Sequence, residues 1–126
     1  VKRDFTWSEI SFQLIPTLHI QLGDKQVPSY GLQFEIHGKQ IFITTDTRFT
    51  PQHFQELYKK AYLIFQDCET AQQKTGVHAH YDDLKPLDPA IKKKMWLYHY
   101  NPGPYAAARR DGFAGFVVKG QSFDLG

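Results

Sequence analysis

The sequence lacks several features that would assign a function directly. Its 126 residues include a single cysteine, Cys68, which excludes an intramolecular disulfide. No apolar run is long enough to span a bilayer, and no signal peptide is visible. The single cysteine gives no firm indication of the compartment. We expect a cytoplasmic protein that has no membrane partner.

Charge and sequence motifs are equally uninformative about the common functional classes. The formal net charge is +2 with neutral histidines, which is too small to indicate nucleic-acid binding on electrostatic grounds. The sequence contains no phosphate-binding glycine-rich loop, and no serine or cysteine nucleophile with a matching base stands out. A nucleotide-binding loop and a covalent hydrolase mechanism are therefore not indicated.

The composition favours one small, sheet-rich domain over residues 1–126. Hydrophobic residues make up 41% of the chain and aromatic residues 15%, so a packed core is expected and disorder is not. The sequence begins at Val1, without a methionine and directly in strand-like sequence. We therefore expect a single domain that is a fragment of a longer protein or a trimmed chain.

The stretch at residues 39–48, KQIFITTDTR, is the most informative part of the sequence. Ile41, Phe42 and Ile43 form an unbroken apolar run, which is typical of a strand buried on both faces. The run ends at Asp46. A carboxylate at the end of a buried strand is costly unless a metal, a cation or several donors meet it, although Asp46 could also simply cap a turn.

The rest of the chain reads as strands first and then as alternating strands and helices. We expect strands at residues 5–14, 17–22, 29–36, 40–45, 62–65 and 95–98, and a last hairpin formed by residues 115–118 and 122–125. Helices are expected after Thr50-Pro51, at Asp88-Pro89 and at residues 106–111. The pattern predicts an α/β fold with one mixed sheet and helices on at least one face.

Polar side chains at or beside the ends of apolar strands are the candidate chemical groups. They are His19, Asp46, His99 and, at the end of another strand, Asp67. Strand ends at one edge of a sheet lie close together, so we expect His19, Asp46 and His99 to converge. Two imidazoles and a carboxylate suit zinc or a similar divalent ion. For each histidine alone, a hydrogen-bonded structural role is the alternative.

A second group of polar residues is the segment HAHYDD, residues 78–83. His78 and His80 alternate, so on an extended segment they would point the same way and could bind one ion. The alternative is a polar loop ahead of the helix at Asp88.

The order of these segments resembles the C-terminal half of the metallo-β-lactamase fold, and within it the ribonuclease Z-like phosphodiesterase branch. LHIQLGDKQVPSYGLQFEI looks like the strand with a metal-binding histidine that precedes a Tyr-Gly strand, and FITTDTR looks like the Gly-Asp-Thr motif, with Thr45 in place of the glycine. LIFQDCET is similar to the strand ending in His-Glu-Ala-Thr, GVHAHYDDL to the His-Ser-Thr segment, and WLYHY to the strand with the last metal ligand.

The resemblance implies half of an αββα sandwich from a binuclear metallohydrolase. His19 and His99 would each bind one ion and Asp46 would bridge the two, with Zn²⁺ most expected and Mn²⁺ or Fe as alternatives. His78, held by Asp67, would protonate the leaving group, and His80 is the substitute for that role. The family's His-x-His-x-Asp-His motif precedes all of these segments and is absent here, so we expect at most a weak, incomplete metal site and no appreciable activity in this chain alone.

A non-catalytic interaction or metal-binding module is the competing class. Half of a sandwich leaves apolar sheet surface uncovered, which predicts a partner: the missing N-terminal half or a second copy of the chain. The aromatic residues expected on this inner face are Trp7, Phe12, Phe34, Phe42 and Phe65. For the full protein, the expected substrate is a phosphodiester or another small molecule, with RNA as a further possibility.

Overall fold

The computed structural model describes residues 3–103 and 107–126, with the side chains of residues 19–22 and 26–28 outside the description. One mixed sheet contains seven strands in sequence order, β1 to β7. Its strands are β1 (Asp4–Trp7), β2 (Ile10–Leu22), β3 (Lys25–Ile36), β4 (Lys39–Ile43), β5 (Leu63–Asp67), β6 (Met95–Tyr98) and β7 (Gly115–Phe116). The helices are α1 (Pro51–Lys60), α2 (Tyr81–Leu84) and α3 (Pro89–Lys92).

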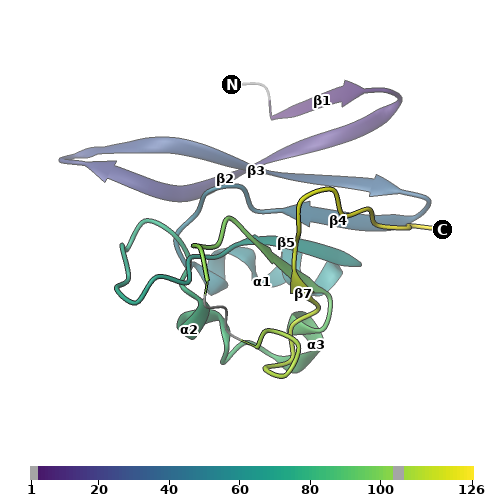
Figure 1. The fold of residues 1–126 in the computed structure, drawn as a ribbon. Helices are drawn as coiled ribbons and strands as arrows, with labels where there is room; N and C mark the ends of the chain where they lie inside the picture. Colours follow the sequence, from purple (N-terminus) through teal and green to yellow (C-terminus); the bar gives the residue numbers. More distant parts are fainter. Residues whose placement is uncertain (1–2, 104–106) are drawn as a thin grey trace.

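The sheet changes from antiparallel to parallel pairing at β4. Strands β1 to β4 pair antiparallel, whereas β4 to β7 pair parallel through connections that carry the helices. Figure 1 shows the long β2–β3 ribbon on one side of the molecule and the helices gathered on the other. The expected mixed sheet with helical cover is therefore confirmed.

The core lies between the parallel part of the sheet and the helices. Phe42 of β4 is fully buried and packs against Phe54 and Tyr58 of α1 at ring-centroid distances of 5.2 and 6.0 Å. Ile64, Met95 and other residues of β5 and β6 complete this layer. The helical spacing of the α1 residues, with proline in the first turn, thus buries the predicted face.

The opposite sheet face carries a row of aromatic side chains. Cross-strand partners share a face, so the pairs Phe5–Phe12 and Phe12–Phe34 place these three rings together, with centroids 4.9 and 4.8 Å apart. Phe65 also lies on this face, packed against Phe123. Phe42 does not: the prediction of one aromatic face was wrong for this residue, because the unbroken run around it carries no alternation.

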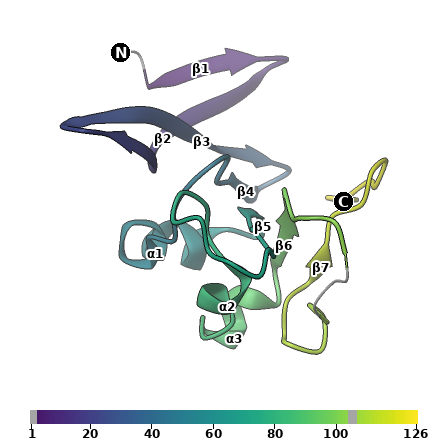
Figure 2. The same ribbon diagram turned by 60° about the vertical axis from the view of Figure 1, so that its left-hand side comes forward.

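The C-terminal segment covers part of this second face. Phe123 packs on both Phe65 and Trp96, and Lys39 Nζ donates to the backbone oxygen of Leu125 at 2.7 Å. Figure 2 shows the segment returning from β7 toward β4. The predicted hairpin of residues 115–118 and 122–125 is absent, since β7 pairs in parallel with β6 and residues 121–126 form no strand.

Other expected boundaries also need correction. The strand predicted at residues 5–14 is broken by a tight turn at Ser8-Glu9, where both residues have positive φ, and the strand at 17–22 continues β2. Pro28 lies inside β3, beside the register shift at Leu18 and Ile20, a place where proline is tolerated. The described part of the helix predicted at 106–111 forms consecutive turns.

None of the helices in the described ranges is long and apolar enough to cross a lipid bilayer.

Candidate metal centre

Three neighbouring parallel strands carry candidate ligands at or just beyond their carboxyl ends. Asp46 follows β4, Asp67 is the last residue of β5, and His99 follows β6. Because these strands are parallel and adjacent in the order β4-β5-β6, their carboxyl ends lie at one edge of the sheet. The sheet topology therefore brings Asp46 and His99 together as the strand-end pattern predicted, with Asp67 between their strands.

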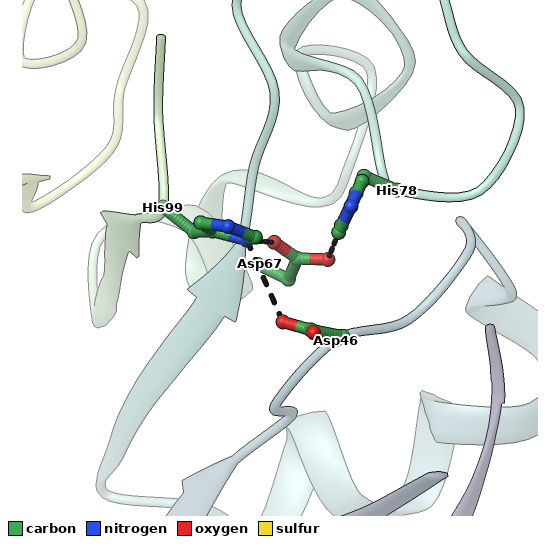
Figure 3. Close-up of side chains that lie close together, drawn as sticks. All are labelled: Asp46, Asp67, His78 and His99. Carbon is green, nitrogen blue, oxygen red and sulfur yellow. Dashed lines mark hydrogen bonds and ion pairs between the residues drawn. The ribbon is translucent and has the colours of Figure 1, made fainter. Parts of the chain in front are cut away.

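Asp67 lies at the centre of this edge. Its side chain is fully buried, and Oδ2 accepts hydrogen bonds from the Thr47 backbone N–H at 3.0 Å and from His78 Nδ1 at 2.6 Å. Oδ1 accepts from His99 Nδ1 at 3.0 Å. Both carboxylate oxygens thus have donors, which is how a buried carboxylate is accommodated. Figure 3 shows the two imidazoles approaching Asp67 from different sides.

Asp46 and His99 form the more exposed side of the same cluster. Asp46 Oδ1 lies 3.5 Å from His99 Nδ1, and their side chains are 48% and 51% exposed. The rings of His78 and His99 pack edge to face with centroids 4.8 Å apart. The cluster is consequently anchored on a buried residue, Asp67, and open to solvent at Asp46 and His99.

The four side chains offer ligand atoms within 4.8 Å of one another, and they could hold a metal ion. Two carboxylates and two imidazoles are a donor set that suits zinc and related divalent ions. The nearby thiol does not join them: Cys68 is buried, and burial followed by the charges of Asp67 and Glu69 raises its pKa. A neutral thiol is a poor ligand.

His80 lies outside this cluster. Its Nδ1 accepts from the Asp82 backbone N–H at 3.1 Å, so it is the N-cap of α2, and its Nε2 lies 2.7 Å from the Ala71 backbone oxygen. A neutral imidazole with an accepting Nδ1 donates from Nε2, which matches these partners. His78 and His80 therefore have separate partners and do not form the joint site that their alternation predicted.

The remaining predicted ligand, His19, lies in β2 at the register shift between Leu18 and Ile20, but its side chain is among those outside the description.

Two supporting features were not anticipated from the sequence. Glu69 is almost completely buried and accepts from the N–H and the hydroxyl of Thr75, which closes the loop leading to His78. Thr45, immediately before Asp46, has a φ of 53°. The only signal for Thr45 was the resemblance itself, because its position corresponds to the glycine of the Gly-Asp-Thr motif and glycine adopts positive φ freely.

Tyr98 is the last residue of β6 and pairs with Asp67 across the two strands. Burial raises the pKa of its phenol, and the negative charges of Asp67 and Asp46 act in the same direction. The phenol therefore stays protonated beside the site at neutral pH.

Comparison with known proteins identifies the family. The sequence profile described as "Anti-Pycsar protein Apyc1" matches residues 1–123. The chain belongs to the anti-Pycsar Apyc1 family. A curated member, the Anti-Pycsar protein Apyc1 of Paenibacillus harenae, is 33% identical over 89 residues. The alignment covers 70% of this chain and 34% of that protein, so the chain spans about a third of its curated Apyc1 relative.

Solved structures place this Apyc1-family chain in the metallo-β-lactamase fold. It is similar to the metallo-β-lactamase fold protein YhfI from Bacillus subtilis, with a TM-score of 0.64, 17% identity, and coverage of 90% of this chain and 47% of YhfI. A diphosphatase of the PhnP family gives a TM-score of 0.54 and 18% identity over 79% of this chain and 36% of that protein. The fold predicted from the resemblance is confirmed.

Proposed function

We propose that this chain supplies the carboxyl-terminal part of the active site of a metal-dependent hydrolase that cleaves phosphodiesters. The observation that carries the proposal is the convergence of Asp46, Asp67, His78 and His99 at the carboxyl edge of β4, β5 and β6. The family description favours a nuclease-like role, the degradation of a cyclic nucleotide. The ribonuclease Z-like branch remains a prediction, as does a cytoplasmic location.

Asp46 and His99 are the proposed metal ligands in the described part of the site. Asp46 Oδ1 and His99 Nδ1 lie 3.5 Å apart at the exposed side of the cluster. Because His99 donates from Nδ1 to Asp67, it would bind the ion through Nε2. His19 remains a proposed ligand on the basis of the resemblance alone. Zn²⁺ is the proposed ion, with Mn²⁺ or Fe as alternatives; such an ion, when bound, polarises a phosphoryl oxygen and activates water.

His78 is the proposed proton donor, and Asp67 its positioning partner. In hydrolysis, the water oxygen bonds to phosphorus as the bond to the leaving oxygen breaks, and the leaving oxygen takes a proton. The 2.6 Å contact between His78 Nδ1 and Asp67 Oδ2 would hold the imidazole ring in a fixed orientation toward the leaving oxygen. His80 is not proposed for this role, because both of its ring nitrogens serve the loop and the start of α2.

The second candidate function is a self-associating interaction module. The observation that favours it is the row of Phe5, Phe12 and Phe34 on the sheet face without helices, together with Trp7, which is 69% exposed. Such an apolar surface favours a partner. The proposed partner is either a segment equivalent to the N-terminal half of the relatives or a second copy of this chain.

Isothermal titration with Zn²⁺ and Mn²⁺ tests the metal site directly. We expect the wild-type chain to bind an ion and both Asp46→Ala and His99→Ala to abolish or strongly weaken that binding. Asp24→Ala is the matched control, because Asp24 is an exposed carboxylate in the β2–β3 turn. Equal binding by wild type and both site variants would contradict the proposal.

Hydrolysis assays separate the fragment from the complete enzyme. We expect no appreciable turnover of bis-p-nitrophenyl phosphate, cyclic mononucleotides or RNA by this chain with added Zn²⁺ or Mn²⁺, because the resemblance places the larger share of the ligands in a segment absent here. Turnover that Asp46→Ala abolishes would show that the chain is catalytically complete on its own.

A further inference from the structure

Thr45 has a backbone conformation that threonine rarely adopts. Its φ is 53°, in the left-handed region where a β-branched side chain is strained. Glycine would relieve that strain, since it has no Cβ. A threonine that keeps this conformation, directly before Asp46, needs support from its surroundings.

The Thr45 hydroxyl joins the Asp46 turn to β3. Thr45 Oγ1 donates to the Tyr30 backbone oxygen at 2.6 Å. The Ser29 hydroxyl lies 3.5 Å from Thr45 Oγ1. Because a threonine hydroxyl has one proton and Tyr30 accepts it, Ser29 is the donor in the second contact. The Thr45 hydroxyl thus connects two residues of β3, Ser29 and Tyr30, to the turn.

The backbone on both sides of Asp46 is also fixed. The Thr44 hydroxyl accepts from the Asp67 backbone N–H at 2.9 Å and donates to the Thr45 backbone oxygen at 2.8 Å. The Thr17 hydroxyl donates to the Asp46 backbone oxygen at 3.2 Å. The turn is consequently tied to β2, β3 and β5, and Thr45 supplies the connection to β3.

We infer that Thr45 is a positioning residue, whose hydroxyl holds the strained turn so that the Asp46 carboxylate faces His99. The energetic cost of positive φ is balanced by the hydroxyl contacts, and strain of this kind gathers at functional sites. The consequence for metal affinity rests on the proposed function. The consequence for the order of the turn does not, because it concerns the chain without metal.

Hydrogen exchange of the metal-free chain tests the inference. The Thr47 and Arg48 backbone N–H groups donate to Asp67 Oδ2 and to the Leu18 backbone oxygen, so their exchange reports on the turn. We expect Thr45→Gly and Thr45→Ala to speed exchange at these amides by roughly fivefold or more, the effect of losing one hydrogen bond. Thr45→Ser keeps the hydroxyl and should stay close to wild type.

A control outside the site separates strain from positioning. His37 has a φ of 51° in the β3–β4 turn, so His37→Gly removes a positive-φ strain of the same kind. It should leave exchange at Thr47 and metal affinity unchanged. Thr45→Gly should unfold no more easily than Thr45→Ala, because both variants lose the hydroxyl but only glycine relieves the strain of positive φ. Thr45→Gly should nevertheless bind Zn²⁺ more weakly than the wild-type chain.

The outcomes distinguish this inference from the proposed function. Wild-type exchange at Thr47 in both Thr45→Gly and Thr45→Ala would overturn the positioning role of Thr45, whether or not the chain binds metal. Faster exchange in a chain whose metal binding is unaffected by Asp46→Ala would support that positioning role and contradict the metal site instead.

Discussion

Gly31→Ala is expected to destabilise the chain and to displace the segment that carries Asp46. Gly31 lies in β3, and a Cβ at this position would be 2.7 Å from the Ile43 backbone oxygen and 3.0 Å from that of Thr44. Backbone oxygens at the end of a buried strand have little room to move. The two residues that must shift directly precede Thr45 and Asp46.

The magnitude follows from two opposing terms. Ordinary contacts between carbon and oxygen are about 3.3 Å or longer, so the overlap with Ile43 is substantial. Overpacking of this kind costs roughly 1–3 kcal/mol, whereas replacing glycine by alanine inside a strand gains about 0.5–1 kcal/mol. The two terms leave a net loss of roughly 0–2.5 kcal/mol in the free energy of unfolding. Because the overlap is with backbone, we expect the upper half of this range, about 1–2 kcal/mol.

Urea unfolding followed by circular dichroism measures this loss, and backbone NMR measures the displacement. Gly38→Ala is the comparison variant: Gly38 has a φ of 75° and nothing within 4 Å of an added methyl group, so its cost is conformational only. We expect chemical-shift changes at residues 44–47 in Gly31→Ala and not in Gly38→Ala. A Gly31→Ala chain as stable as wild type, with unchanged shifts there, would refute the reasoning.

Two further predictions concern the core and the open sheet face. Tyr58→Phe should lower the free energy of unfolding by about 1–3 kcal/mol, because the Tyr58 hydroxyl donates to the buried Gln66 Oε1 at 2.5 Å. Tyr62→Phe, at an exposed ring, should change the free energy of unfolding little. Equal losses for the two variants in urea titrations would contradict the explanation. In analytical ultracentrifugation over a concentration series we expect self-association through the face that carries Phe12 and Phe34, weakened by Phe12→Ser; a monomer at all concentrations would exclude a second copy as the partner.

The candidate site was predictable from the sequence because its residues interrupt apolar runs. Asp46 and His99 follow buried strands and Asp67 ends one, and parallel pairing brings the three strand ends together. His78 was a candidate from the alternating histidines at residues 78–80, and its partnership with Asp67, which came from the resemblance, is the contact observed. The separate role of His80 was not predictable. Nothing in the alternation of His78 and His80 indicates that His80 caps α2 and therefore lies outside the site.

The errors in the fold have equally local causes. The turn at Ser8-Glu9 contains neither glycine nor asparagine, so its positive φ angles had no sequence signal. Phe42 lies in an unbroken apolar run, from which the buried face cannot be read. The tail around Phe123 adds cover to the sheet instead of a strand, since it packs through its side chains onto Phe65 and Trp96.

A Mn²⁺ titration of the metal-free chain followed by NMR tests the central claim most directly, because the paramagnetic ion broadens the signals of nearby residues. We predict selective broadening of the signals of Asp46, Asp67, His78 and His99. In His99→Ala the broadening of the remaining cluster residues should disappear or weaken strongly. His53, an exposed histidine of α1 whose Nε2 lies 2.7 Å from the Pro16 backbone oxygen, is the internal control and should keep its signals. Broadening centred on His53, or none at the four cluster residues at saturating Mn²⁺, would contradict a metal centre at this edge of the sheet.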